Sequence, residues 1–216
     1  MRRPKVVEIM GINNSGKSNL MLYLERYFGP ADKPNVLFIS DQIRQALVTG
    51  ELNKNLWALG RIRTLVLESK EQTRDLVVIE RGAGAIFASL ETFLRTGSHI
   101  EGVKDKRKAE SSIVAALDFL KQEEDFFILI KASVDVAMKR DVREGKDTPG
   151  IFANPFFLGE LQESYRLLEE NSLPSHRKKV VNGDLDLEKD TEMIKKCRGK
   201  IIEKLISLIP MPNGKT

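Results

Sequence analysis

The stretch GINNSGKS, residues 11–18, lies between the apolar run KVVEIM and the helix-like segment NLMLYLERYF. It fits the pattern G-x-x-x-x-G-K-[ST], whose defined positions are Gly11, Gly16, Lys17 and Ser18. In this motif a glycine-rich turn aims backbone N–H groups at a polyphosphate, at a helix N-terminus that carries about half a positive charge. Because strand, loop and helix follow in the required order, we interpret the stretch as a phosphate-binding loop.

Two side chains of this loop have distinct expected roles. Lys17 would neutralise charge on the β- and γ-phosphates of ATP, and the Ser18 hydroxyl would ligate Mg²⁺. The rest of the loop would surround the same nucleotide. The predicted nucleotide-binding residues are Gly11, Asn13, Asn14, Ser15, Gly16, Lys17, Ser18 and Asn19.

The composition of the 216-residue chain fits a single domain over residues 1–216. Apolar residues make up 41% and charged residues 31%, an ordinary globular balance. Cys197 is the only cysteine, which excludes an internal disulfide, and the first residues lack the apolar run of a signal peptide. No stretch approaches the roughly 20 apolar residues of a membrane span. We therefore expect a cytoplasmic protein without a membrane partner.

The net charge of +4 is a small excess and does not by itself indicate a nucleic-acid partner. The densest basic cluster is KDKRK, residues 104–108, which we expect to be a solvated loop, because no aromatic residue is interleaved to stack on bases. A small anionic partner is favoured over nucleic acid. The sequence leaves the oligomeric state open, with a homodimer as one option.

Five short apolar runs alternate with longer amphipathic segments, and they are KVVEIM, NVLFIS, LVVIE, FFILIK and KKVVN. This alternation predicts an α/β fold with three layers, in which helices cover both faces of a five-stranded parallel sheet. Helical spacing is visible over residues 51–75 and 111–125, and the last helix is expected at about residues 187–208. In such sheets ligands bind at the carboxyl ends of the strands, so we look for functional side chains there.

The third apolar run ends in the charged pair Glu80 and Arg81. We expect this strand to lie beside the first one, which would bring Glu80 near the metal and Arg81 near the phosphate that is transferred. A merely solvated charge pair at a strand end is the alternative.

The residues around Glu80 and Arg81 also resemble a motif of known kinases. The segment VVIERGAGAIFASLETFLRTG, residues 77–97, resembles the Asp/Glu-Arg motif of thymidylate kinases and deoxynucleoside kinases, which belong to the P-loop nucleoside and nucleotide kinases. FFLGELQESYRLLEE resembles the helix after the lid in thymidylate kinases, and VVNGDLDLE resembles their last strand and adenine-side loop. The resemblance implies a kinase that uses ATP and Mg²⁺ and acts on a nucleoside or nucleotide.

The chain departs from these kinases directly after Arg81. Thymidylate kinases usually have a bulky residue there and deoxynucleoside kinases a serine, whereas this chain has Gly82, Ala83 and Gly84. The base specificity of the family therefore does not carry over.

A second basic cluster, AMKRDVREGKD, contains Lys139, Arg140 and Arg143. Arg140 and Arg143 are three residues apart and share a helix face. A solvated basic face is one interpretation. The segment also resembles the arginine-bearing lid of the same kinases, which we place near residues 139–150 and which would bring both arginines to the phosphates.

Asp41 follows the second strand, in LFISDQIRQAL. It could cap the next helix, together with or instead of Ser40. In nucleoside kinases a carboxylate at this place is the base toward the acceptor hydroxyl. Asp41 with Arg44 three residues later also resembles the acceptor loop of adenylylsulfate kinases and polynucleotide 5′-kinases.

We therefore expect an ATP-dependent phosphotransferase of the nucleoside or nucleoside-monophosphate kinase type. A hydroxyl-directed kinase of the polynucleotide or adenylylsulfate type is one alternative, and an NTP-hydrolysing switch or a nucleotide-binding regulator is another. The residues expected to be catalytic are Lys17, Asp41, Glu80, Arg81, Arg140 and Arg143, and the metal would be held by Ser18 and Glu80.

Overall fold

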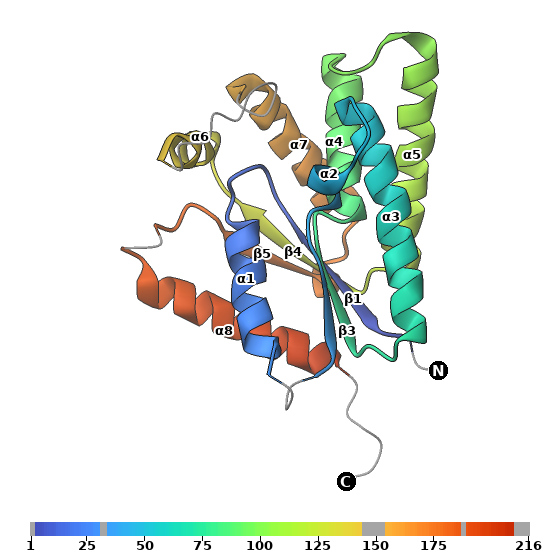
Figure 1. Ribbon diagram of the computed structural model, residues 1–216. Helices are drawn as coiled ribbons and strands as arrows, with labels where there is room; N and C mark the ends of the chain where they lie inside the picture. The colour runs from blue at the N-terminus through green and yellow to red at the C-terminus, as the bar shows by residue number, and fades with distance from the viewer. Residues whose placement is uncertain (1–2, 31–33, 144–153, 187–188, 210–216) are drawn as a thin grey trace.

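The computed structural model describes residues 3–30, 34–143, 154–186 and 189–209, with the backbone alone at 141–143. Its centre is a parallel sheet of five strands in the order β2-β3-β1-β4-β5 (Figure 1). The strands are β1 (Lys5–Met10), β2 (Val36–Ile39), β3 (Leu76–Glu80), β4 (Phe126–Lys131) and β5 (Lys178–Asn182). All five predicted strands are confirmed, and so is the expectation that β3 lies beside β1.

The central strands read as apolar runs because the sheet is covered on both faces. Val7 pairs with Val78 and Ile9 with Glu80 across β1 and β3. The register places the end of β3 level with the last residues of β1, just before the phosphate-binding loop. Glu80 is thereby brought to the loop by strand pairing alone.

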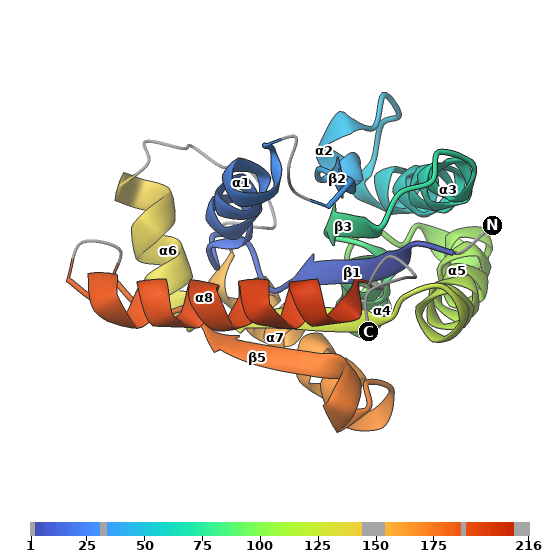
Figure 2. The ribbon, with the colours of Figure 1, turned by 90° about the horizontal axis from the view of Figure 1, so that it is seen from below.

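Helices form a layer on each side of this sheet, which confirms the three-layer fold (Figures 1 and 2). On one face, α1 (Lys17–Phe28) and α8 (Thr191–Leu208) share a buried apolar cluster with β1, β3 and β4. The other face is covered by α3 (Glu51–Glu71), α4 (Ala83–Thr96), α5 (Gly102–Gln122) and α7 (Pro155–Asn171). The short elements are α2 (Gln42–Gln45), α6 (Val134–Arg143) and the 3₁₀ turn η2 (Ser175–Arg177).

Two expectations about helices were wrong. Residues 104–108 are not a loop, because they lie in the first turns of α5, which begins at Gly102. Lysine and arginine are good helix formers, and Asp105 pairs with Lys108 at 3.4 Å one turn later. The last helix and its end at Leu208 are confirmed, but it begins at Thr191 rather than near 187, and residues 187–188 lie outside the described part.

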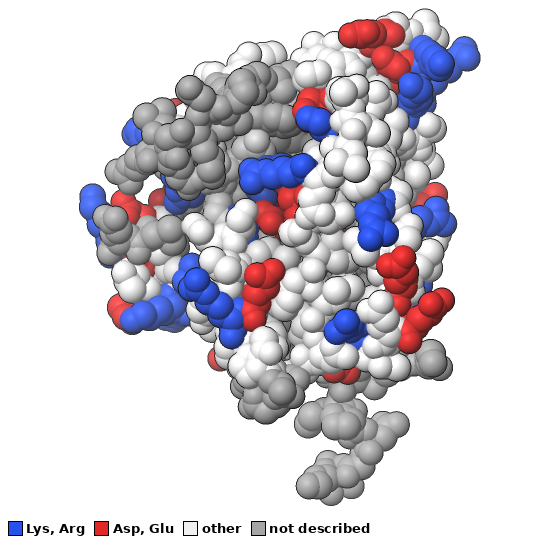
Figure 3. All heavy atoms as spheres, viewed as in Figure 1, with Lys and Arg blue, Asp and Glu red and all other residues white. Residues whose placement is uncertain are grey.

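The charges on the face seen in Figure 1 are mixed. Figure 3 shows lysine and arginine side chains interspersed with aspartate and glutamate, rather than gathered in one basic area. None of the helices in the described part of the chain has the length and apolar character needed to cross a bilayer.

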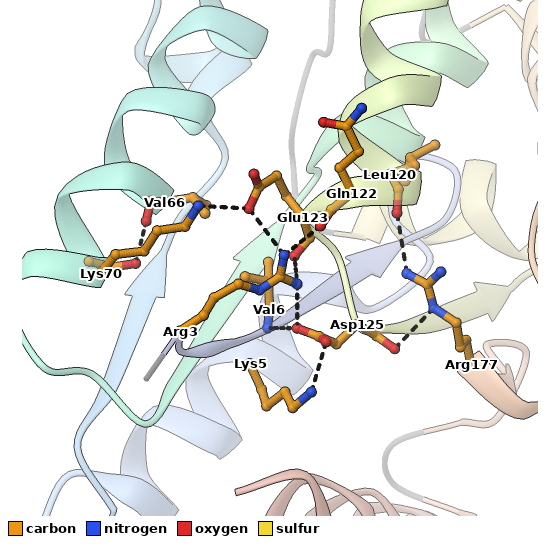
Figure 4. A network of polar contacts seen from close by, with 11 residues as sticks. Arg3, Lys5, Val6, Val66, Lys70, Leu120, Gln122, Glu123, Asp125 and Arg177 are labelled. Atoms are coloured by element: carbon orange, nitrogen blue, oxygen red, sulfur yellow. Dashed lines mark hydrogen bonds and ion pairs between the residues drawn. The ribbon is translucent and has the colours of Figure 1, made fainter. Parts of the chain in front are cut away.

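A polar network ties together the edge of the sheet where β1 and β4 begin, opposite the phosphate-binding loop (Figure 4). Asp125 accepts hydrogen bonds from the Arg3 side chain at 3.0 Å, from Lys5 Nζ at 3.0 Å and from the Val6 backbone at 2.9 Å. Burial opposes ionisation of Asp125, but these three donors outweigh it and hold its pKa below the ordinary value. Glu123 contacts Lys70 at 3.0 Å, so the turn between α5 and β4 is fixed on both sides of Glu124.

Candidate nucleotide-binding and phosphoryl-transfer site

The loop between β1 and α1 has the conformation that its glycines allow. Gly11 has φ 145°, and a Cβ atom there would lie 2.4 Å from the carbonyl oxygen of Ile130. Gly16 has φ 102° and is the N-cap residue of α1. Both positions exclude an ordinary side chain without strain, so the glycines of the motif are required by geometry.

Lys17 is the buried cation of this loop. Its Nζ donates hydrogen bonds to the carbonyl oxygens of Gly11 at 2.9 Å and Ile12 at 2.6 Å. Burial lowers the pKa of Lys17 well below its ordinary value, and the positive charge of Arg81 adds to this effect. The loop thus holds a partly desolvated ammonium group where bound phosphates would stabilise its charge.

Ser18 and Glu80 form the second feature of the site. The Ser18 hydroxyl donates to Oε1 of Glu80 at 2.6 Å, which joins the first turn of α1 to the end of β3. A hydroxyl beside a carboxylate is a set of hard oxygen ligands. Mg²⁺ commonly binds through one or two carboxylates together with waters and substrate phosphates, so these two residues fit the ion. Among the described residues, no group of three or more His, Cys, Asp or Glu side chains is arranged to hold a metal.

Arg81 links the phosphate-binding loop to the neighbouring strand end. Its NH2 donates to Oδ1 of Asn13 at 2.5 Å, and its NH1 lies 3.0 Å from Oδ2 of Asp41. The backbone of Arg81 has φ 56°, a left-handed conformation that is uncommon for a residue with a side chain. Such conformations persist where surrounding contacts enforce them, and they are frequent at functional sites.

Asp41 uses both of its carboxylate oxygens. Oδ1 accepts from the backbone of Ile43 at 3.1 Å and of Arg44 at 3.4 Å, so Asp41 is the N-cap of α2. Oδ2 contacts Arg81 and the Nε of Arg44, the latter at 3.4 Å. The cap role is therefore present, and Ser40 is not the cap. The same carboxylate also faces the charged centre of the site, where the role of base stays a prediction.

A cavity of about 480 Å³ extends from the loop along the carboxyl edge of the sheet. Arg140 spans one side of it, because its guanidinium donates to the carbonyl oxygens of Asn14 at 3.1 Å and Leu185 at 2.9 Å. The predicted site residues that line the cavity are Asn14, Ser15, Gly16, Lys17, Ser18, Asn19, Glu80, Arg81 and Arg140. Gly11, Asn13 and Asp41 do not line it directly but contact residues that do.

The predicted lid is only partly described. Lys139 lies in α6 and lines the cavity. Ser133 accepts from the backbone of Val136 at 3.3 Å at the start of this helix. The side chain of Arg143 and residues 144–150 lie outside the described residues.

The far end of the cavity is formed by the loop after β5 and by α8. Asp184 accepts from the backbone of Ser133 at 2.6 Å, which joins this loop to the start of α6. Residues 181–186 line the cavity, and the role of this segment as an adenine-side loop stays a prediction. Cys197 and Arg198 of α8 also line it. Neither residue was predicted from the sequence, because their surroundings show no motif.

Three further residues near the site were also missed. Glu8 and Glu124 are buried carboxyls that contact the start of α4. Tyr165 of α7 is buried and shares a hydrogen bond with the backbone of Gly11, and burial raises its pKa. For Glu8 the signal was available, since a charged residue interrupts the apolar run of a central strand.

The loop after β1, the acid at the end of β3 and the arginine that follows it thus lie at one edge of a three-layer α/β fold of the P-loop nucleoside kinase kind. One solved structure with this fold is that of a deoxyadenosine kinase from M. mycoides, with the products dCMP and a flexible dCDP bound. The TM-score is 0.62 at 13% sequence identity, and the match covers 90% of this chain and 99% of that one. The chain therefore resembles deoxynucleoside kinases in fold. No family model and no curated protein sequence matches it.

Proposed function

We propose that the protein is an ATP-dependent phosphotransferase of the nucleoside or nucleoside-monophosphate kinase type. The observation that carries the proposal is the convergence of Lys17, the Ser18–Glu80 pair and the Arg81–Asp41 pair at one edge of the sheet. A nucleotide-binding loop alone would also serve a hydrolysing switch. The arginine and acid pair next to it supports an acceptor site on the side of α2.

Each residue has a defined task in this proposal. Lys17 and the backbone N–H groups of the loop would hold the phosphates, and Arg140 would hold the cavity closed between the loop and Leu185. Ser18 and Glu80 would bind Mg²⁺, which supplies neutralisation of phosphate charge when bound. Arg81 would stabilise the charge that spreads over the transferred group, and Asp41 would orient both Arg81 and the acceptor.

The acceptor chemistry is tied to Asp41. A hydroxyl acceptor keeps its proton at neutral pH and benefits from a carboxylate within hydrogen-bond reach. A monophosphate has its second pKa near about 6, so it is already ionised and depends more on arginines. Asp41 offers the carboxylate, and Arg81 and Arg44 offer the guanidinium groups. We favour a nucleoside or nucleotide acceptor. The acceptor panel described next tests whether the acceptor carries a phosphate.

The test is ADP release from MgATP, measured alone and with a panel of nucleosides and nucleoside monophosphates. Release that depends on one acceptor, with the phosphorylated product identified by mass spectrometry, would support the proposal. Release without any acceptor would favour a hydrolysing switch, and nucleotide binding without release would favour a regulator. Lys17→Ala serves as the inactive reference in each arm.

A further inference from the structure

The central strand β1 carries a charged side chain in its middle. Glu8 is fully buried and points to the face of the sheet that α4 covers, the same face as its strand neighbours Val6 and Met10. Its two carboxylate oxygens accept hydrogen bonds from the backbone of Gly84 at 2.8 Å and Ala85 at 2.9 Å. Glu8 therefore supplies the anion at the N-terminus of α4, whose own N-cap residue has no capping side chain.

A second buried carboxyl meets the same helix end. Glu124 shares a hydrogen bond with Glu8, and its Oε1 accepts from the backbone of Ala83 at 3.4 Å. Its Oε2 has no hydrogen-bond partner among the described residues. Glu123 and Asp125 on either side are held in the surface network of Figure 4, which fixes the turn that carries the buried Glu124.

Two carboxyls in contact inside the protein cannot both be charged without a large electrostatic cost. Burial raises the pKa of both groups, and the charge of Glu8 raises that of Glu124 further. Two backbone N–H groups stabilise the ionised form of Glu8. We therefore assign the single shared proton to Glu124 and the negative charge to Glu8.

The glycines that follow Arg81 are explained by this pair. A Cβ atom on Gly82 would lie 2.9 Å from Cδ of Glu8 and 3.1 Å from Oε1 of Glu124. A Cβ atom on Gly84 would lie 3.0 Å from Oε2 of Glu8. The carboxyls fill the space that a larger side chain would need. The buried pair therefore requires glycine at positions 82 and 84.

The pair connects the two segments that carry the site. Glu8 lies three residues before Gly11, and Gly82 directly follows Arg81. The backbone N–H of Arg81 donates to the carbonyl oxygen of Ile9 at 3.1 Å, which adds a second tie between the same segments. The left-handed backbone of Arg81 is thus held between β1 on one side and the capped end of α4 on the other.

We propose that Glu8 and Glu124 are positioning residues of the proposed kinase, a carboxyl pair sharing one proton that fixes Arg81 against the phosphate-binding loop. This inference rests on the proposed function. The groups that face the pair are the backbone N–H groups of α4, Arg177 from η2 and Tyr165 from α7. Arg177 favours the charged form of Glu124 but does not outweigh its burial and the charge of Glu8.

A pH dependence follows from this arrangement. When rising pH removes the shared proton, two negative charges meet at the start of α4, and the turn that carries Arg81 must shift. The maximal rate of phosphoryl transfer should then fall on the alkaline side, because Arg81 no longer keeps its place against the phosphate-binding loop. Lys17, whose pKa is lowered by burial, also responds to alkaline pH, but it does so in every variant that is compared.

The experiment compares the pH profiles of the maximal rate for wild type, Glu124→Gln and Glu123→Gln. A glutamine at 124 keeps a donor toward Glu8 but has no proton to lose, so the part of the alkaline fall that comes from the pair should disappear. It should remain in Glu123→Gln, the matched surface control. In Glu8→Gln the maximal rate should drop by about a hundredfold at every pH, the effect expected of a small misplacement, with unchanged affinity for MgADP.

Two measurements without turnover keep this test separate from that of the proposed function. The first is the amide hydrogen-exchange protection of residues 83–86, corrected for the base-catalysed rise of the intrinsic exchange rate, which should decrease at alkaline pH in wild type and not in Glu124→Gln. The second is the infrared band of a protonated carboxyl in wild type, which tests the pair even if a variant does not fold. An alkaline fall or exchange profile that is the same in wild type and Glu124→Gln, or the absence of the band at neutral pH, would overturn the inference.

Discussion

The guanidinium of Arg81 lies 3.0 Å from Oδ2 of Asp41, and this ion pair joins the ends of the neighbouring strands β3 and β2. Both side chains are almost fully buried, with exposed fractions of 10% and 8%. A buried pair of this kind is costly to break by removing one partner, because the other charge is left without compensation. Because the ion pair lies next to Lys17, we expect variants of either residue to change the rate of phosphoryl transfer.

Replacing Asp41 by asparagine should separate the two classes of acceptor. The amide oxygen can still accept from Ile43 and Arg44, so α2 stays capped, but the carboxylate base is lost. With a hydroxyl acceptor the maximal rate should fall by about 10²- to 10⁴-fold. With a monophosphate acceptor the fall should be much smaller, because only the ion pair that orients Arg81 is lost.

The measurement is the maximal rate of Asp41→Asn on the best nucleoside and the best nucleoside monophosphate of the panel. The control is Asp118→Asn on α5, outside the site. Equal and small effects on both acceptors would leave Asp41 with its cap role alone.

Replacing Lys17 by alanine should abolish phosphoryl transfer while the fold is kept. The loss expected for one preorganised electrostatic donor is about 2.7–4 kcal/mol of transition-state stabilisation. Turnover and thermal unfolding are measured together with Lys106→Ala, an exposed lysine of α5. Near-normal turnover in the folded Lys17→Ala protein would contradict the assignment of the loop.

Replacing Arg140 by alanine should widen one side of the cavity. Its guanidinium bridges the carbonyl oxygens of Asn14 and Leu185, so the variant loses two contacts between the phosphate loop and the loop after β5. The lid resemblance also predicts that Arg140 brings its positive charge to the phosphates, and a charge that acts in the transition state affects the maximal rate more than the Michaelis constant for ATP. Steady-state kinetics of Arg140→Ala beside Arg26→Ala, an exposed arginine at the end of α1, provide the check. A raised Michaelis constant with an unchanged maximal rate would show that Arg140 only holds the nucleotide.

Local sequence patterns predicted the strands and the loop because both depend on short-range chemistry. The apolar runs of β1 and β3 and the spacing of Gly11, Gly16 and Lys17 are visible without any tertiary contact. The position of Glu80 beside Ser18 also followed, since strand order is limited by the rules of parallel sheets.

Long-range pairing explains what the sequence did not reveal. Glu8 and Glu124 are far apart in the chain, and only the packed core shows that their carboxyls meet. Residues 104–108 were predicted to be a loop because a dense basic cluster is expected in solvent. The high helix propensity of lysine and arginine was not considered, and these residues lie in α5. The part played by α8 in the cavity depends on how that helix crosses the sheet, which no local pattern encodes.

Two glycines in helices should respond oppositely to alanine. A Cβ atom on Gly84 would lie 2.8 Å from Cε of Met10, so Gly84→Ala should lower the free energy of unfolding by about 1–3 kcal/mol through overpacking. Gly60 in α3 is exposed and has no atom within 4 Å of the added carbon. Gly60→Ala should therefore raise the free energy of unfolding by about 0.5–1 kcal/mol. Urea denaturation of both variants checks the pair, and a stabilised Gly84→Ala would contradict the packing around Glu8.

Glu124 should contribute a loss of stability with rising pH above the ordinary glutamate pKa of 4.5, because it keeps its proton in the folded state and loses it in the unfolded chain. In this window the unfolded state binds one proton fewer than the native state. The free energy of unfolding should therefore decrease by about 1.4 kcal/mol per pH unit until Glu124 ionises in the native state. Asp125, whose pKa is lowered, contributes the opposite dependence at more acidic pH.

Glu124→Gln removes the proton-linked part of this dependence and leaves the other titrating groups in place. Urea denaturation at a series of pH values should therefore show a steeper loss of stability in wild type than in Glu124→Gln, with a difference in slope of about 1.4 kcal/mol per pH unit. Glu123→Gln should keep the wild-type slope, because Glu123 lies in the surface network on the other side of the turn. Parallel curves for wild type and Glu124→Gln would mean that Glu124 is ionised in the folded protein. Glu8 and Glu124 would then share no proton, and a positively charged group would have to balance the two carboxylates.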